Sequence, residues 1–382
     1  MGKVAILIGA FPESTQTFIV RLAQYFPASV ITNNLLQNNK KLFNIENVKI
    51  CNAGHINFPL IGYTLKKIQE LKRKITNQPQ YEWNYFELQS ARKFILENDI
   101  KHIVACFGPH GVSASRLGKE LGIPVITYFL GVDASGVYFK HRKYIRDLKY
   151  LFETNEFIVV LNDWMAAEFM KLGCPESKIK KINLGVPTQE LKQFQLRKSK
   201  IFKFISIGRF VEKKAPILTI KAFEECANKN PNVALLMIGE GELFKKAETY
   251  AKKSKHNSKI HLLGYKTQSE IKKIIRECHV FVQHSVEASN GDREGWPVAI
   301  AEACCYGLPV ISTRHAGIVE QILHGKSGYL VEEYDYIKMG TYMCKLSVNP
   351  RLAQEMGEQA RKYIESVGDI EDQIIKFWKL LN

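Results

Sequence analysis

Short runs of apolar residues alternate with stretches of helical spacing along the whole chain. Most of these runs are continuously apolar, which is typical of parallel strands covered by helices on both faces. Strands that alternate with helices predict βα units and therefore an α/β fold. The expected strands are residues 4–9, 29–33, 47–51, 102–108, 124–131 and 157–162 in the first half, and 202–209, 233–241, 260–265, 280–285, 309–314 and 328–332 in the second.

The strand-and-helix series restarts near Ile201 after a polar stretch, residues 188–200, which we interpret as a linker between domains. A chain of 382 residues is long for one core and suits two α/β domains. The predicted domains are residues 1–186 and 187–365, each Rossmann-like. Apolar spacing near the end predicts a last helix within 366–382. Packing of that helix against the first domain is one option that the pattern leaves open.

Glycine closes several of the expected strands at their carboxyl ends. Ligands approach an open α/β sheet at this edge, and glycine lets the backbone come close to them. Each glycine taken alone is equally well explained by a turn. The glycines are Gly9, Gly108, Gly131, Gly208, Gly239 and Gly264.

The chain has a formal net charge of +16, and both of its halves are basic. The densest basic segment is residues 60–75, in which Lys and Arg surround the single acid Glu70. An amphipathic helix of this kind can lie on an anionic membrane, but it can equally be a solvated helix over the core. Charge alone also permits nucleic-acid binding. Because the sequence holds no recognisable binding module, we expect no nucleic-acid partner.

Targeting signals are weak in this sequence. No stretch reaches the roughly 18 apolar residues that a membrane span requires. The apolar N-terminus stops at Pro12 and is better explained as a buried strand than as a secretion signal. The eight cysteines form no C-x-x-C pair, so we expect reduced thiols. These patterns predict a cytoplasmic protein, with attachment to the inner face of the plasma membrane if the basic segment binds lipid.

The most informative chemistry lies in residues 285–320. Pro297 can open an apolar helix without losing a hydrogen bond. The free N–H groups at the helix start, together with the helix dipole, form an anion site. Glu294 precedes this helix and Glu302 lies inside it, so the two carboxylates could reach opposite ends of one ligand whose phosphates occupy the helix start. Without its surroundings, the same pair would be an acid at a helix N-terminus and a solvated acid.

The surrounding motifs resemble one family and occur in its order from Gly9 to about Asp335. E-x7-E followed by AxxxGxPVIsTrhaGIvE is similar to the family 4 retaining glycosyltransferases of the GT-B fold, in which two Rossmann-like domains face each other across a cleft. Other motifs are similar to the branch that builds bacterial exopolysaccharides, colanic acid and O-antigens. The supporting motifs are GRFVEKKAP, LLMIGEGEL, NGDREGWP, ACFGPHG and FPESTQTFI.

The resemblance implies a UDP- or GDP-sugar donor bound by the second domain. Arg209 and Lys214 would clamp the diphosphate and stabilise the leaving group, Glu302 would hold the ribose, and Glu294 the donor sugar. Without a ligand, Lys213 and Lys214 would be a solvated pair at a helix start. The implied donor-site residues are Gly9, Arg209, Lys214, Gly239, Gly264, Glu294, Gly295, Trp296, Val298 and Glu302.

The first domain would bind the acceptor, a saccharide or lipid-linked saccharide. The family commonly has His in an F-H-G-x-D strand end, but this chain has Leu130 at that place and retains Asp133. Asp133 and His110 are therefore the candidates to orient or deprotonate the acceptor, with Phe11 also on the acceptor side. Asp133, Arg209, Lys214 and Glu294 are the predicted catalytic residues.

No D-x-D pair is present, so we expect no metal cofactor and neutralisation of the diphosphate by side chains and the helix dipole. The resemblance implies transfer of a hexosyl-type group with retention of configuration. Two other readings stay open. One is a nucleotide-sugar epimerase or hydrolase with the same fold, and the other, suggested by Leu130, is a sugar-nucleotide binder with impaired catalysis.

Overall fold

The computed structural model describes residues 3–12, 17–25, 28–36, 45, 48–54, 83–194 and 199–381. It divides into two compact units, one formed by Met1–Asn183 with Ile374–Asn382 and the other by Leu184–Gln373. The basic segment 60–75, for which a membrane helix and a solvated helix were both considered, lies outside the described residues.

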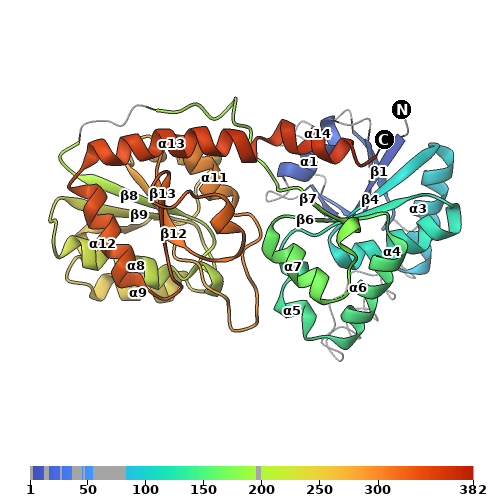
Figure 1. Cartoon of the computed structure of the whole chain (residues 1–382), viewed down its shortest axis with the longest axis horizontal. Coiled ribbons are helices and arrows are strands. Elements are labelled where there is room, and N and C mark those ends of the chain that lie inside the picture. The colour runs from blue at the N-terminus through green and yellow to red at the C-terminus, as the bar shows by residue number, and fades with distance from the viewer. Residues whose placement is uncertain are drawn as a thin grey trace. The chain divides into compact units, whose positions relative to one another are not determined.

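In the described part of the first unit, seven parallel strands form a sheet in the order β3-β2-β1-β4-β5-β6-β7, and helices cover both of its faces (Figure 1). The six strands expected in the first half are confirmed. The pattern missed β7, because Lys180 and Lys181 make this short edge strand polar. The elements are β1 (Lys3–Phe11), α1 (Thr17–Tyr25), β2 (Ala28–Leu35), β3 (Lys49–Asn52), α3 (Tyr85–Glu97), β4 (Ile100–Cys106), α4 (Gly108–Leu121), β5 (Val125–Tyr128), α5 (Gly136–Phe139), α6 (Arg142–Thr154), β6 (Phe157–Val160), α7 (Asp163–Lys171) and β7 (Ile179–Lys181).

The second unit repeats this architecture with six parallel strands among its described residues, in the order β10-β9-β8-β11-β12-β13. All six strands expected in the second half are confirmed, so both units have the predicted Rossmann-like α/β fold. The elements are β8 (Phe202–Ile207), α8 (Pro216–Ala227), β9 (Val233–Ile238), α9 (Phe244–Lys253), β10 (Ile260–Leu262), α10 (Gln268–Ile275), β11 (Val280–Val282), α11 (Val298–Cys305), β12 (Val310–Thr313), β13 (Gly328–Val331), α12 (Tyr336–Ser347), α13 (Pro350–Gly368) and α14 (Ile370–Trp378).

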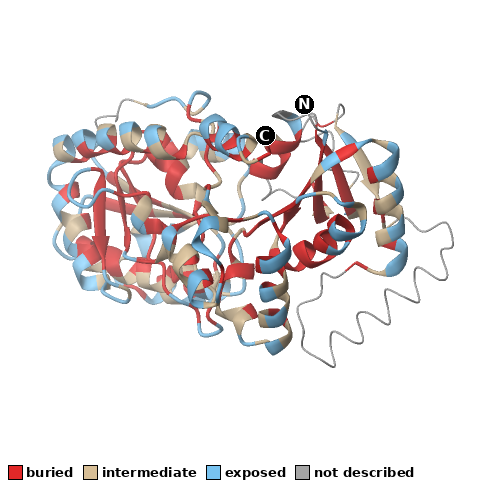
Figure 2. Cartoon of the chain, turned by 45° about the vertical axis from the view of Figure 1, so that its right-hand side comes forward, coloured by how far each residue is buried: buried red, intermediate tan, exposed pale blue. Residues whose placement is uncertain are grey.

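Most strand residues in both sheets are buried, and most of these buried residues are apolar (Figure 2). In the second unit the core joins Phe204 and Leu235 of the sheet to Phe223 of α8 and Met343 of α12. Burial of such side chains is the main favourable term in folding and explains the continuously apolar strands. Helix α14 crosses the division between the units after Gln373, and its Phe377 ring packs 5.5 Å from the Tyr128 ring within the first unit.

The polar stretch interpreted as a linker is tied to the second unit over residues 188–194. The guanidinium of Arg361 on α13 donates hydrogen bonds to the backbone oxygens of Thr188, at 2.7 Å, and Leu191. Phe194 stacks on Tyr306 with 4.6 Å between ring centroids. The division between the units accordingly falls before this stretch, at Asn183 and Leu184.

The helix starts that follow the strands differ in how they are capped. Helices α3 and α10 begin with complete capping boxes, from Asn84 and Thr267. Helices α4, α8 and α11 have no side-chain cap. The start of α11 therefore leaves N–H groups available to a ligand, whereas the Gly108 N–H at the start of α4 donates to Asp133.

Candidate functional site

The second unit gathers charged side chains at the carboxyl edge of its sheet. Arg209 follows β8, a 3-10 turn at Glu212–Lys214 precedes α8, and Gln283 follows β11. Glu294 lies in the loop between β11 and α11. Parallel strands end at one edge, so residues distant in sequence meet there.

Lys214 and Glu294 form a buried ion pair. The Lys214 Nζ lies 3.0 Å from Glu294 Oε1 and donates a hydrogen bond of 3.2 Å to Gln283 Oε1. Burial opposes ionisation of Glu294, but the attraction of Lys214 and Lys213 outweighs it and lowers the pKa of the carboxyl. Glu294 Oε1 is buried against the Lys214 ammonium, and the carboxylate has further lone pairs that can accept from a ligand hydroxyl.

Positive charge exceeds negative charge beside this pair. Burial lowers the pKa of Lys214, and the nearby Arg209 guanidinium lowers it further against the pull of Glu294. Arg209 is exposed and has no ion pair within the described part of the chain. An anion that approaches Arg209 and Lys214 would relieve this repulsion.

Lys213 also has a fixed partner. Its Nζ lies 3.0 Å from Asp292 Oδ1 and donates to the Arg293 backbone oxygen at 3.1 Å. The interpretation of Lys213 and Lys214 as a solvated pair is therefore wrong, because each is buried against an acid of the same loop. The sequence pattern could not show this, since the acids lie about 80 residues away along the chain.

Helix α11 provides the second acid of the E-x7-E motif. Glu302 is half-buried, and its carboxyl has no polar partner among the residues that the structure describes. Burial raises the pKa of Glu302 to about 7. This carboxyl is poised to accept hydrogen bonds from neutral hydroxyl groups, which would compensate for its burial.

The loop residues next to Glu294 differ in what they offer. Trp296 is buried with its ring over Gly368, so only its backbone is placed to meet a ligand at the helix start. Gly295 is buried as well, and Val298 is half-buried at the uncapped start of α11.

Two predicted glycines have different structural reasons. A Cβ on Gly239, which has φ of 136°, would lie 2.0 Å from the Gly208 backbone oxygen. Gly264 has φ of 66° and open space around its Cα. The Gly264 oxygen accepts from the Gly239 N–H at 2.9 Å, so these turns pack together behind Arg209.

Sequence reasoning missed His315 and Glu333. The His315 ring is fully buried, and its Nε2 accepts the Glu294 backbone N–H at 3.1 Å. Its Nδ1 lies 2.6 Å from Glu333 Oε1. The only available signal was a histidine directly after a strand, which is more often structural than functional.

Asp133 of the first unit is fully engaged by backbone donors. Its Oδ2 accepts from the Gly108 N–H at 3.0 Å, and its Oδ1 accepts from the N–H groups of Leu130 and Gly131 at 3.1 and 2.9 Å. Burial raises the pKa of Asp133 to about 6, against the effect of these hydrogen bonds. The side chain ties the turn after β5 to the start of α4.

The other predicted acceptor residues lie around β1 and α4. The Trp83 indole donates to His110 Nδ1 at 3.2 Å, which places the proton of a neutral His110 ring on Nε2. That Nε2 lies over Gly9, where a Cβ would come within 2.8 Å of it. Phe11 is fully buried, and Leu130 is half-buried at the end of β5.

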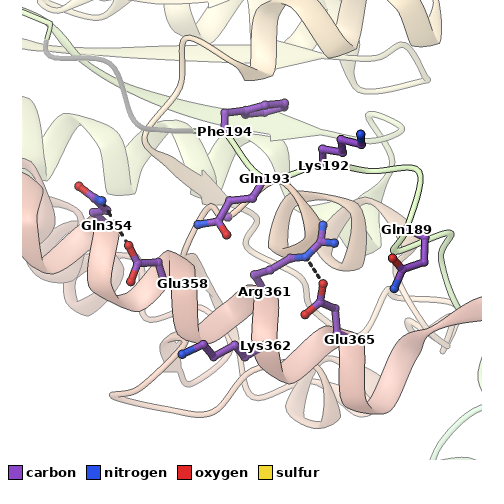
Figure 3. A pocket seen from close by; sticks show the side chains of 10 residues that line it. Gln189, Lys192, Gln193, Phe194, Gln354, Glu358, Arg361, Lys362 and Glu365 are labelled. Atoms are coloured by element: carbon purple, nitrogen blue, oxygen red, sulfur yellow. Dashed lines mark hydrogen bonds and ion pairs between the residues drawn. The ribbon is translucent and has the colours of Figure 1, made fainter.

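A separate hollow of about 730 Å³ lies between residues 189–194 and α13 (Figure 3). Its walls include Arg361, which pairs with Glu365, and Glu358, which accepts from Gln354. None of the predicted site residues lines it.

Among the residues that the structure describes, no group of three or more His, Cys, Asp or Glu side chains is arranged to hold a metal ion. No helix in that part of the chain is both long and apolar enough to span a bilayer.

Comparison with solved structures agrees with the two-domain fold. The chain is similar over its whole length to Anabaena Alr3699/HepE in complex with UDP, with a TM-score of 0.77, 14% identity and coverage of 100% of this chain and 99% of that one. It is likewise similar to TarM, with a TM-score of 0.74, 14% identity and coverage of 100% and 99%. These likenesses confirm the GT-B fold.

Sequence relatives come from the predicted branch. The chain is 32% identical over 239 residues to the colanic acid biosynthesis glycosyltransferase WcaL of Escherichia coli (strain K12), which is 61% of this chain and 58% of that protein. It is 31% identical over 248 residues to the amylovoran biosynthesis glycosyltransferase AmsK of Erwinia amylovora, which is 63% and 60%. The matches thus span about three fifths of the length of these curated relatives.

A family model described as "Glycosyl transferases group 1" matches residues 187–363, which contain Arg209, Lys214, Glu294 and Glu302. This match and the relatives confirm the resemblance predicted from the motifs. Residues 187–363 of this chain are therefore similar to the glycosyl transferases group 1 family.

Proposed function

We propose that this chain is a retaining glycosyltransferase that moves a sugar from a UDP- or GDP-sugar to a saccharide acceptor during synthesis of a bacterial surface polysaccharide. One observation carries the proposal. Arg209 and the Lys214–Glu294 pair lie at the same sheet edge as the uncapped α11 and the unpartnered carboxyl of Glu302. Cationic groups and free helix N–H groups suit a diphosphate, and carboxylates suit sugar hydroxyls.

Each side chain has a distinct role toward the donor. Arg209 and Lys214 neutralise the diphosphate, with the first N–H groups of α11, and Glu302 accepts from the ribose hydroxyls. Glu294, held by Lys214, accepts from a hydroxyl of the donor sugar. The UDP and UDP-glucose bound by the structurally similar Alr3699/HepE support a nucleotide-sugar donor.

The reaction exchanges one bond at the anomeric carbon. The bond from that carbon to the diphosphate oxygen breaks, and the acceptor oxygen attacks from the same face. The acceptor proton passes to the departing phosphate, whose charge Arg209 and Lys214 stabilise most strongly as it develops. No metal is required in this scheme, because these cations and the helix start supply the positive charge.

The acceptor belongs to the first unit in this proposal, and a lipid-linked saccharide at the inner membrane face suits the net charge of +16. The names of WcaL and AmsK, which refer to colanic acid and amylovoran, support a polysaccharide product. Asp133, with both oxygens bound to backbone N–H groups, would act by shaping the acceptor loops.

The stereochemical outcome tests the mechanism. The protein is incubated with α-linked UDP- or GDP-sugars and with lipid extract or saccharide acceptors. The anomeric configuration of the product is then determined from its NMR coupling constants. We expect an α-linked donor to give an α-linked product. An inverted product would contradict the front-side mechanism, and donor turnover that is equally fast without acceptor would favour the epimerase or hydrolase.

A second candidate rests on Leu130, which replaces the histidine of the family motif at the end of β5. It is a sugar-nucleotide binder with impaired catalysis. Normal nucleotide affinity without transfer to any acceptor, together with activity gained by Leu130→His, would favour it over the enzyme.

A further inference from the structure

A buried histidine and a glutamate clamp the loop that carries Glu294. His315 follows β12 and is fully buried, whereas Glu333 follows β13 and is partly exposed. The two side chains touch, with 2.6 Å between His315 Nδ1 and Glu333 Oε1. Together they reach both ends of the loop at Glu287–Glu294.

Every polar atom of this pair has a defined partner. His315 Nε2 accepts the Glu294 N–H at 3.1 Å, so the neutral ring carries its proton on Nδ1 and donates it to Glu333 Oε1. The other oxygen of Glu333 accepts the Glu287 N–H at 2.9 Å. The carboxylate thus orients the ring and holds one end of the loop, while the ring holds the other end.

The rest of the loop is tied down from other directions. Lys213 holds Asp292 and the Arg293 oxygen, and Glu212 accepts from the N–H and hydroxyl of Ser289 at 2.9 and 2.7 Å. The Arg293 oxygen belongs to the same peptide unit as the Glu294 N–H, so Lys213 holds one side of this peptide and His315 the other. Among the residues that the structure describes, the His315 ring accepts the Glu294 N–H.

We propose that His315, oriented by Glu333, is a positioning residue that fixes the Glu294 carboxylate against the donor sugar. The inference rests on the proposed function for the role of Glu294, but the clamp itself does not. When the backbone of such a carboxylate shifts by about 1 Å, its hydrogen bond to a particular hydroxyl loses most of its strength. The Lys214 contact alone cannot fix the position of the Glu294 carboxylate, because a lysine ammonium on a flexible side chain can follow the carboxylate to many positions.

Two substitutions at position 315 separate the two hydrogen bonds. In His315→Gln the amide oxygen can take the place of Nε2 and accept the Glu294 N–H, although contact with Glu333 is lost. In His315→Asn the amide can reach Glu333 in place of Nδ1 but cannot reach Glu294. The matched control is His279→Gln, which removes another buried ring that accepts a backbone N–H, from Lys203 at 3.0 Å, at the opposite end of β11.

The first measurement is hydrogen exchange of the ligand-free full chain, followed by mass spectrometry of peptides that cover residues 286–296. We expect faster exchange in His315→Asn, exchange near the wild-type rate in His315→Gln, and no change in His279→Gln. Wild-type exchange of this loop in His315→Asn would overturn the inference.

The second measurement is calorimetric titration with UDP and GDP and with the matching UDP- and GDP-sugars. The affinity ratio between nucleotide-sugar and nucleotide should fall roughly tenfold in His315→Asn, the size of one lost hydrogen bond, and recover in His315→Gln. An unchanged ratio despite faster exchange would overturn the positioning role. If the wild type binds no nucleotide, the proposed function fails, and exchange alone decides whether His315 clamps the loop.

Discussion

Glu294 and Glu302 belong to one motif, but their surroundings give them opposite protonation behaviour. Two lysines lower the pKa of Glu294, whereas burial without a cation raises the pKa of Glu302 to about 7. The first carboxyl therefore stays ionised to lower pH than an ordinary glutamate. The second stores an unfavourable charge above pH 7 that a ligand can relieve.

Replacement of Glu302 by Gln should stabilise the ligand-free protein at high pH. The folded-state pKa of about 7 exceeds the ordinary value of 4.5. Between these values the folded protein keeps a proton that the unfolded chain has lost, so the carboxyl lowers stability as pH rises through this window. We expect Glu302→Gln to raise the free energy of unfolding by about 1–2 kcal/mol at pH 8 and by almost nothing at pH 4.5. Urea titrations at both pH values check this, and an equal effect at both would contradict it.

Loss of one member of the Lys214–Glu294 pair should cost more than loss of both. Lys214→Met leaves a buried carboxylate without its nearest cation, and we expect it to lower stability by about 3–5 kcal/mol. Lys214→Met combined with Glu294→Gln should recover most of that loss. Urea unfolding of the single and double variants measures the difference. Equal instability of the two would show that the pair is not coupled.

At the scale of elements, the turn after β5 depends on Asp133. Asp133→Asn replaces one acceptor oxygen by an NH₂ group that faces backbone N–H donors. We expect the first unit to lose about 1–3 kcal/mol, while affinity for UDP and GDP stays unchanged. Thermal unfolding and calorimetric titration test the two parts. A large loss of transfer at wild-type stability would instead favour direct contact of Asp133 with the acceptor.

The two glycine turns behind Arg209 offer a matched comparison. Gly239→Ala would put a Cβ 2.0 Å from the Gly208 oxygen, whereas Gly264→Ala meets nothing within 4 Å and has only its φ of 66° to accommodate. Gly264→Ala should therefore cost about 1–2 kcal/mol, and Gly239→Ala clearly more. Urea unfolding measures both losses. An equal loss of unfolding free energy in the two variants would mean that the turn after β9 can move away from Gly208, and would contradict close packing at this edge.

The elements were largely predictable, and the contacts between them were not. Continuously apolar runs revealed the strands around Ile6, Val104 and Leu235, because burial on both faces leaves a direct mark on composition. The edge strand β7 has no such mark. The motif with Glu294 and Glu302 predicted the sheet edge at which we propose the donor site. Its connections to His315 and Gln283 depend on tertiary folding, which brings together residues far apart in the chain.

At the scale of the molecule, the segment after the first unit is bound firmly to the second. Arg361 donates to the oxygens of Thr188, Leu191 and Cys305, the last of which ends α11. Polar composition alone suggested a linker, because hydrogen bonds from a distant arginine leave no local pattern. The same helix α11 carries Glu302, so this segment and the donor site share one element.

The central claim is that the second unit binds a nucleoside diphosphate through Glu302 and its neighbours. The most direct test is thermal unfolding of the full chain with UDP, GDP and ADP, for the wild type and for Glu302→Ala. A ligand at 100 times its dissociation constant should stabilise its unit by about 2.7 kcal/mol. We predict stabilisation by UDP or GDP that disappears in Glu302→Ala. Absence of stabilisation by any of the three nucleotides, or equal stabilisation of the variant, would contradict the proposed donor site.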